Sequence, residues 1–228
     1  MHAYVKSIRA LFTQHADPKK AAPMKRYMRD QFEYLGIKVP EMGNLLKQHI
    51  RENGLPPLAE LDPILRDLWA LPPREFQYAA NGLLEKFEAQ LPPKFIKTLE
   101  YMLVTKSWWD TVDTIATGTL GINFKRYPKV RDKYLTRWRK SDNFWLRRAT
   151  ILFQLGYKKD TDFELLCAII RENLGSQEFF INKAIGWALR QYTRVDSQGV
   201  RDFVAVTPLN PLSAREALKW LEKKESST

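Results

Sequence analysis

The sequence repeats itself with a period of 35 residues in its second half. Three segments with the apolar spacing of a helix begin at aromatic residues one period apart, which are Trp109, Phe144 and Phe179. Four positions further along, the same lattice carries Asp113, Arg148 and Lys183. Two-helix units of about this length are typical of HEAT-like repeats, which stack so that equivalent positions lie in a row along one face. We therefore expect the three polar side chains to point the same way from adjacent repeats.

Helix breakers divide the whole chain into short segments. The prolines recur at Pro18, Pro40, Pro56, Pro72, Pro92, Pro128, Pro208 and Pro211. Proline suits the first turn of a helix and ends the helix before it, so we expect helices of about 10–16 residues joined by short turns. No sustained alternation of apolar and polar residues predicts a strand. The sequence therefore predicts an all-α fold, a right-handed α-solenoid of HEAT-like two-helix repeats with a concave groove, in a single domain over residues 1–228.

Positive charge dominates the chain and gathers in its middle. Lys and Arg number 37 against 26 Asp and Glu, which gives a net charge of +11, and the pI is near 9.7. Between Lys125 and Arg148 only Asp132 and Asp142 are acidic. The basic residues of that stretch are Lys125, Arg126, Lys129, Arg131, Lys133, Arg137, Arg139, Lys140, Arg147 and Arg148. A solvated helix face explains part of this excess, but a surface that faces phosphates fits it better. In the alternative interpretation, a groove with the same basic lining binds acidic peptides instead of nucleic acid.

Several other classes of function lack their sequence signatures. No apolar run approaches the roughly 18 residues that a membrane span needs. Cys167 is the single cysteine, so no internal disulfide forms, and a reducing cytoplasm is the expected compartment. His2, His15 and His49 make no zinc pattern with it, and no glycine-rich nucleotide motif is present. We expect a monomer without metal or cofactor.

A candidate site emerges from the repeat lattice. Trp109 and Asp113 are four residues apart and share one helix face, and Arg148 faces them from the next repeat. Trp187 brings a second indole from the following repeat. Two indoles beside a carboxylate would cage a cation or a developing positive charge. In the alternative interpretation the tryptophans are core residues, as we expect for Trp108, and Asp113 only braces Arg148.

Six stretches of the chain together resemble one known family. They are MKRYMRDQFEYLGI (24–37), LWALPPREFQYAA (68–80), TKSWWDTVDTI (105–115), SDNFWLRRATILFQLGYK (141–158), EFFINKAIGWALRQY (178–192) and PLSAREALKWL (211–221). In these the sequence resembles the AlkD family of DNA glycosylases over nearly its whole length. The resemblance implies a C-shaped stack of HEAT-like repeats around duplex DNA. It also implies excision of N3- and N7-alkylated purines, without extrusion of the damaged base.

The resemblance also implies roles for individual residues. The family's active-site set falls on Asp113, Trp109 and Trp187. Contacts to DNA are expected for Arg148, Tyr27, Lys183, Arg190, Lys106, Phe179 and Phe180. A cationic purine is a good leaving group, so Asp113 would stabilise an oxocarbenium-like sugar and orient water. No motif places a lysine as a Schiff-base nucleophile, so we expect a monofunctional enzyme. A non-catalytic binder of DNA structures and a scaffold for acidic peptides are the competing functions.

Overall fold

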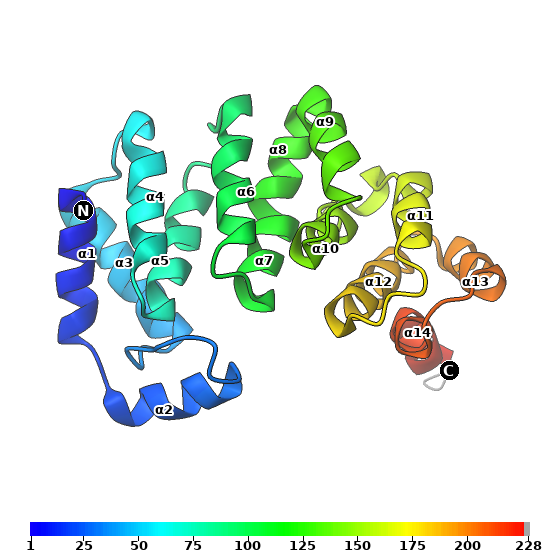
Figure 1. The fold of residues 1–228 in the computed structure, drawn as a ribbon, viewed down its shortest axis with the longest axis horizontal. Coiled ribbons are helices and arrows are strands. Elements are labelled where there is room, and N and C mark those ends of the chain that lie inside the picture. Colours follow the sequence, from blue (N-terminus) through cyan, green and yellow to red (C-terminus); the bar gives the residue numbers. More distant parts are fainter. Residues whose placement is uncertain (226–228) are drawn as a thin grey trace. The chain divides into compact units, whose positions relative to one another are not determined.

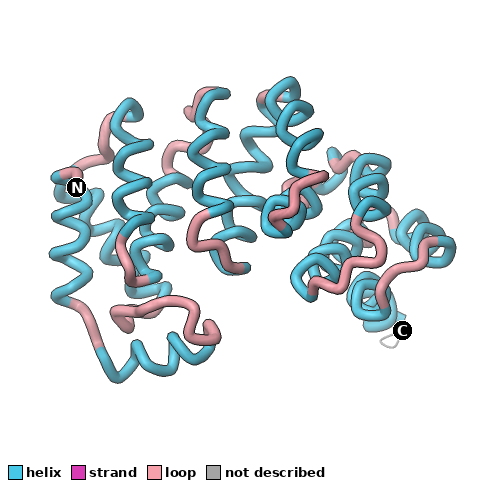
Figure 2. The backbone as a smooth tube through the Cα atoms, in the orientation of Figure 1, coloured by secondary structure: helices cyan, strands magenta, loops and turns pink. Residues whose placement is uncertain are grey.

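The computed structural model describes residues 1–225, and these are almost entirely helices and short turns (Figures 1 and 2). The described residues contain no strand, and Glu33 and Pro73 form an isolated β-bridge. The all-α prediction is confirmed. The chain divides into two compact units, Met1–Thr98 and Leu99–Thr228. The predicted single domain and C-shaped groove concern both units together and stay predictions.

The first unit packs four helices around an apolar core and carries a fifth on its surface. Its helices are α1 (Ala3–Gln14), α2 (Pro18–Tyr27), α3 (Val39–Asn53), α4 (Leu61–Ala70) and α5 (Arg74–Glu85), with 3-10 turns at Leu58–Glu60 and Pro93–Phe95. α1 packs against α3 and α4, and α5 packs against the same two helices (Figure 1). α2 has no buried residue. Prolines stand in the first turn of α2 and α3 and directly before α5, as the proline spacing predicted. α1, α3, α4 and α5 each bury one apolar face.

A buried carboxylate fixes the loop that follows α2. Glu75, in the first turn of α5, has no exposed surface. Its side chain accepts hydrogen bonds from the backbone N–H groups of Leu35, Gly36 and Ile37, at 2.9–3.2 Å. Gly36 has a φ of 91°, and a Cβ there would lie 2.1 Å from the carbonyl oxygen of Asp17. Glycine is therefore required where the loop passes α2.

The second unit stacks helices in chain order. After α6 (Ile96–Val104), which crosses the boundary between the units, come α7 (Trp109–Ile115), α8 (Gly121–Arg126), α9 (Pro128–Trp138), α10 (Phe144–Leu152), α11 (Phe163–Glu172), α12 (Phe179–Tyr192), α13 (Ser197–Val206) and α14 (Pro211–Glu225). A π-helical segment, Ala116–Leu120, joins α7 to α8. α10 packs against α7, α9, α11 and α12, and α12 also packs against α13 and α14. No helix within residues 1–225 combines the length and the hydropathy of a membrane-spanning segment.

The period of the sequence reappears as contacts between neighbouring repeats. Asp113 and Arg148 form an ion pair 35 positions apart, and Lys125 pairs with Asp160 at the same separation. The Tyr157 hydroxyl donates to the carbonyl of Gly121, 36 positions earlier. Polar contacts thus join equivalent places in consecutive helix pairs, as expected of a stacked helical array.

Candidate functional site

The local sequence fixes where α7 and α10 begin, the two helices that carry Asp113 and Arg148. Trp108 is extended (φ −157°, ψ 161°) and precedes the first turn of α7, so Asp113 comes one turn after Trp109. On α10, the side chain of Asn143 caps the helix by accepting from the backbone N–H of Trp145 at 2.9 Å. This cap sets the start of the helix that carries Arg148.

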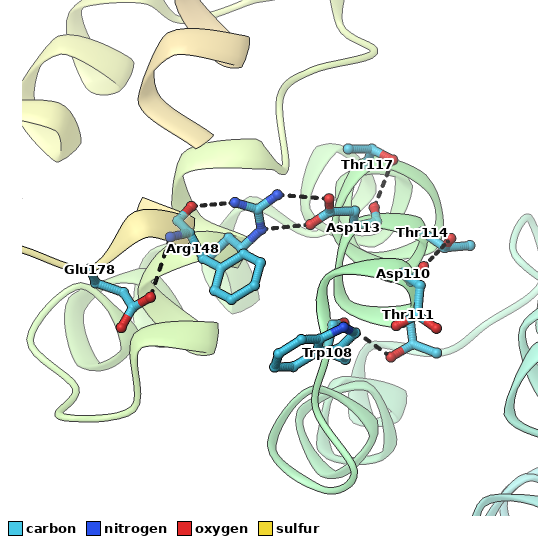
Figure 3. A network of polar contacts seen from close by, with 9 residues as sticks. Trp108, Asp110, Thr111, Asp113, Thr114, Thr117, Arg148 and Glu178 are labelled. Atoms are coloured by element: carbon cyan, nitrogen blue, oxygen red, sulfur yellow. Dashed lines mark hydrogen bonds and ion pairs between the residues drawn. The ribbon is translucent and has the colours of Figure 1, made fainter. Parts of the chain in front are cut away.

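Asp113 and Arg148 form a bidentate ion pair between α7 and α10. The Nε and Nη2 atoms of Arg148 donate to Oδ1 and Oδ2 of Asp113, each at 2.7 Å (Figure 3). The side chain of Arg148 is 5% exposed and that of Asp113 is 15% exposed. Two parallel charge-assisted bonds fix the plane of the carboxylate.

The guanidinium of Arg148 also reaches α12. Its Nη1 donates to the backbone carbonyl of Phe180, and its Cζ lies 5.9 Å from the centre of the Phe180 ring. Arg148 therefore ties together α7, α10 and α12, which belong to consecutive repeats. The sequence predicted the pair with Asp113 but gave no signal for the carbonyl of Phe180, since backbone acceptors leave no trace in residue types.

The carboxylate of Asp113 keeps unused acceptor capacity. An ionised carboxylate offers about four lone-pair positions, and Arg148 occupies two of those on Asp113. Among the described residues no other group donates to this carboxylate. Burial raises the pKa of Asp113, against the opposing effect of the Arg148 guanidinium. The group thus combines limited solvent access with free acceptor positions, as a site that stabilises positive charge requires.

The two predicted indoles are both accessible in part. Trp109 is the first residue of α7 and is half-buried. Trp187 is half-buried on α12, two helical turns beyond Phe180 and on the same side of the helix. Neither ring is enclosed in the core. Their convergence on one sugar stays a prediction.

An aromatic cluster occupies the starts of α7, α10 and α12. The ring of Trp108 lies 5.9 Å from that of Trp145 and 5.2 Å from that of Phe180. Trp145 and Phe180 lie 4.9 Å apart, so the three rings form one packed group. Trp108 packs in this cluster and is half-buried, whereas we predicted a core position for it. Phe179, at the edge of the cluster, is 51% exposed.

Two of the cations predicted to contact DNA are paired within the protein. Lys183 and Arg190 both bind Glu216 of α14, with N–O distances of 3.1 and 2.5 Å. Although burial opposes it, these two cations lower the pKa of Glu216. Lys183 therefore does not join Asp113 and Arg148 in one polar group. Glu216 lies outside the helical motif that carries the two cations, and sequence reasoning missed it.

The basic stretch of the sequence is also partly neutralised. Three of its members pair with acids from other repeats, which gives the pairs Lys125–Asp160, Arg137–Glu100 and Arg139–Glu172. Arg131 pairs with its neighbour Asp132. Within the described chain, the exposed Lys129, Lys133 and Lys140 have no ion pair. The surface offered to phosphates is therefore narrower than the local count of charges indicated.

The remaining predicted contact residues lie in separate places. Tyr27, at the end of α2 in the first unit, is 74% exposed. Lys106 precedes α7 in the left-handed region (φ 48°) and is half-buried. No group of three or more His, Cys, Asp or Glu among the described residues is arranged to hold a metal ion.

Comparisons with known proteins agree on one family. The family described as DNA alkylation repair enzyme matches residues 8–221. A solved structure described as a predicted DNA alkylation repair enzyme from Enterococcus faecalis is 32% identical in sequence. It superposes with a TM-score of 0.84, covering 91% of this chain and 97% of that chain. A comparison with curated proteins gave no match. The chain belongs to the DNA alkylation repair enzyme family.

Proposed function

We propose that this protein is a monofunctional DNA glycosylase that releases cationic N3- and N7-alkylated purines from duplex DNA. One observation carries the proposal: Asp113 is held rigidly by Arg148 yet keeps acceptor positions and some exposure. The family assignment supports repair of alkylated DNA as the biological setting.

The chemistry of the lesion explains why one carboxylate suffices. An alkylated purine with a formal positive charge leaves as a neutral base, so no general acid is needed. The barrier lies in forming the oxocarbenium-like sugar, whose positive charge a fixed carboxylate stabilises. Asp113 supplies the stabilising negative charge, and one of its unused acceptor positions orients the attacking water.

Arg148 has a positioning role in this proposal. Its two bonds fix the carboxylate plane of Asp113, and its third bond fixes the start of α12. Trp109 and Trp187 would direct their electron-rich ring faces toward the cationic sugar. A neutral base gains little from such a cage, so selectivity follows the charge of the lesion. The resemblance to the AlkD family adds that the damaged base stays stacked during excision.

A base-release assay tests the proposal. Duplexes that contain 3-methyladenine, 7-methylguanine or uracil are incubated with the protein, and abasic sites are then cleaved with alkali. We expect release of both methylated purines and none of uracil. Without alkali the strand should stay intact, because a monofunctional enzyme does not cut it. Tight DNA binding without release would instead identify a non-catalytic binder of DNA structures.

The peptide-scaffold alternative has its own discriminating measurement. Affinity for duplex DNA should fall steeply as salt rises, because phosphate contacts release counterions. A scaffold for acidic peptides would show weak DNA affinity and no base release from any of the three duplexes.

A further inference from the structure

A cavity of about 540 Å³ lies within the second unit, among the ends of α10 and α12 and the start of α11. It begins close to the candidate site. Its lining residue Ile151 is one helical turn beyond Arg148, and Gln191 is one turn beyond Trp187. The volume is in the range of ligand pockets in proteins. Neither Asp113 nor Arg148 lines this cavity, so the proposed reaction does not use it.

The floor of the cavity is apolar and aromatic. Ile151, Leu155, Leu166 and Ala188 contribute aliphatic side chains. Tyr192 stands beside them, with its ring stacked on Phe163 at 4.4 Å between centres. A preformed apolar floor of this kind suits a flat, poorly hydrated group such as a nucleobase.

The rim of the cavity is cationic. Lys158, Lys159 and Arg194 are all exposed, and in the described chain none of them forms an ion pair. Asp160 is the acidic lining residue, and Lys125 neutralises it across a 2.5 Å contact. The rim therefore carries an uncompensated positive charge that favours a phosphate.

The two glutamines that line the cavity differ in how many hydrogen bonds their side chains already form. Gln154 exchanges two hydrogen bonds with the backbone of Asp162, through its Nε2 at 3.2 Å and its Oε1 at 2.8 Å. The half-buried side chain of Gln191 forms no hydrogen bond with the described residues. Its amide offers both donors and an acceptor, which match the polar edge of a nucleobase.

We propose that this cavity binds one nucleoside monophosphate unit, with the base on the apolar floor beside Gln191 and the phosphate at Lys158, Lys159 and Arg194. Two sources have this chemistry, a free mononucleotide and a nucleotide of the DNA strand near the lesion. The second source rests on the proposed glycosylase function, and the first does not.

Calorimetric titration of the full chain with three probes tests the assignment. The probes are 2′-deoxyadenosine 5′-monophosphate, deoxyadenosine and inorganic phosphate. We expect the monophosphate to bind at least tenfold more tightly than either fragment, because only it engages both floor and rim. Equal affinity for the monophosphate and inorganic phosphate would overturn the proposal, as would absence of binding.

Paired variants localise the binding. Lys158→Gln/Lys159→Gln should weaken the monophosphate at least tenfold, whereas Lys94→Gln/Lys97→Gln, which changes two other exposed lysines, should not. Val195 lines the cavity and is 40% exposed, so Val195→Trp should block it without disturbing the core. Val206→Trp is the matched control, since Val206 is 79% exposed and lies outside the cavity. Unchanged binding in Val195→Trp would contradict the assignment.

Two further arms separate the sources and keep the proposal independent of catalysis. If the occupant is a strand nucleotide, Lys158→Gln/Lys159→Gln should raise the KM for a lesion duplex at unchanged kcat, and the monophosphate should compete with the duplex. If it is a free mononucleotide, neither effect should appear. The Asp113→Asn protein should bind the monophosphate as tightly as the unmodified chain. A protein that fails to release bases but binds the monophosphate would therefore refute the proposed function alone.

Discussion

Two carboxylates, the buried Glu75 of the first unit and the partly buried Asp113 of the second, show what distinguishes a structural acid from a candidate catalytic one. Glu75 in the first unit is fully buried and accepts from three backbone N–H groups. Asp113 in the second unit is 15% exposed and accepts from a single side chain, Arg148. The first carboxylate holds a loop in place, and its bonding capacity is largely used within the protein. The second retains capacity on a side that solvent reaches.

Burial alone therefore does not identify a functional acid. Both carboxylates lie next to an arginine in sequence or in space, since Arg74 precedes Glu75. The two carboxylates differ in how many hydrogen-bond donors the fold already supplies and in whether solvent still reaches the carboxylate. Buried polar groups with every bond made rigidify a fold, and those with unused positions are available for chemistry.

The largest expected effect of a substitution is on stability, at Glu75. Glu75→Gln turns one acceptor oxygen into a donor that faces backbone N–H groups. We expect the free energy of unfolding to fall by about 4 kcal/mol, since buried charge-assisted bonds are lost and N–H groups are left unpaired. Denaturant unfolding measures this. The molecules that remain folded should still release 7-methylguanine. A variant that folds stably but releases no base would show that Glu75 is more than a structural acid.

Next in size is the replacement of the positioning arginine. Arg148→Lys removes the planar fork, so one ammonium cannot serve both Asp113 oxygens and the Phe180 carbonyl. We expect the single-turnover rate of excision to fall roughly tenfold or more, as loosened geometry costs rate. Rate measurements on a 7-methylguanine duplex test this.

The same variant makes a prediction about pH. In the proposed mechanism excision needs ionised Asp113, so the rate should fall as pH falls through the pKa of that group. Burial already raises this pKa, and the guanidinium opposes the rise. Arg148→Lys keeps a positive charge beside Asp113 but loses one of the two hydrogen bonds to its carboxylate, so the acid limb of the rate profile should move to higher pH. An unchanged acid limb would show that Arg148 does not act on the ionisation of Asp113.

A smaller effect is expected at the second indole. Trp187→Leu removes an aromatic face from the half-buried position on α12. We expect excision of cationic purines to slow about 3- to 30-fold, which corresponds to the usual strength of a cation–π contact. Trp187→Phe keeps a ring and should retain most of the rate. Equal losses in both variants would indicate a packing role in place of an electrostatic one.

The smallest effect should come from the exposed lysines of α9. Lys129→Gln/Lys133→Gln removes two cations that form no ion pair within the described chain. If both contact phosphates, the slope of log affinity against log salt should fall by about 0.9 for each contact. Binding titrations over a range of salt concentrations measure this. An unchanged slope would place the DNA elsewhere on the protein.

Local patterns predicted most of the fold. Helical spacing and proline positions gave the all-α class, and the 35-residue lattice placed Asp113 opposite Arg148. These features depend on residues close in sequence or one repeat apart, where spacing alone decides which side chains meet.

Partners that come from outside a motif could not be predicted. The count of charges between Lys125 and Arg148 missed acids from neighbouring repeats, such as Glu100 and Glu172. The ion pair between Glu216 and Lys183 likewise could not be predicted from any motif. Long-range ion pairs depend on how helices pack, so charge in a linear window overestimates the charge that remains for a ligand.

Single-turnover release of 7-methylguanine by Asp113→Asn, measured per folded molecule, tests whether the Asp113 carboxylate stabilises the cationic sugar. We expect a loss of roughly 100- to 1000-fold, the usual effect of removing one electrostatic stabiliser. Asp110→Asn, which removes the same charge one turn earlier on α7, should change the rate far less. A folded Asp113→Asn protein that releases the base at the full rate would rule out this catalytic role and leave Asp113 as a structural partner of Arg148.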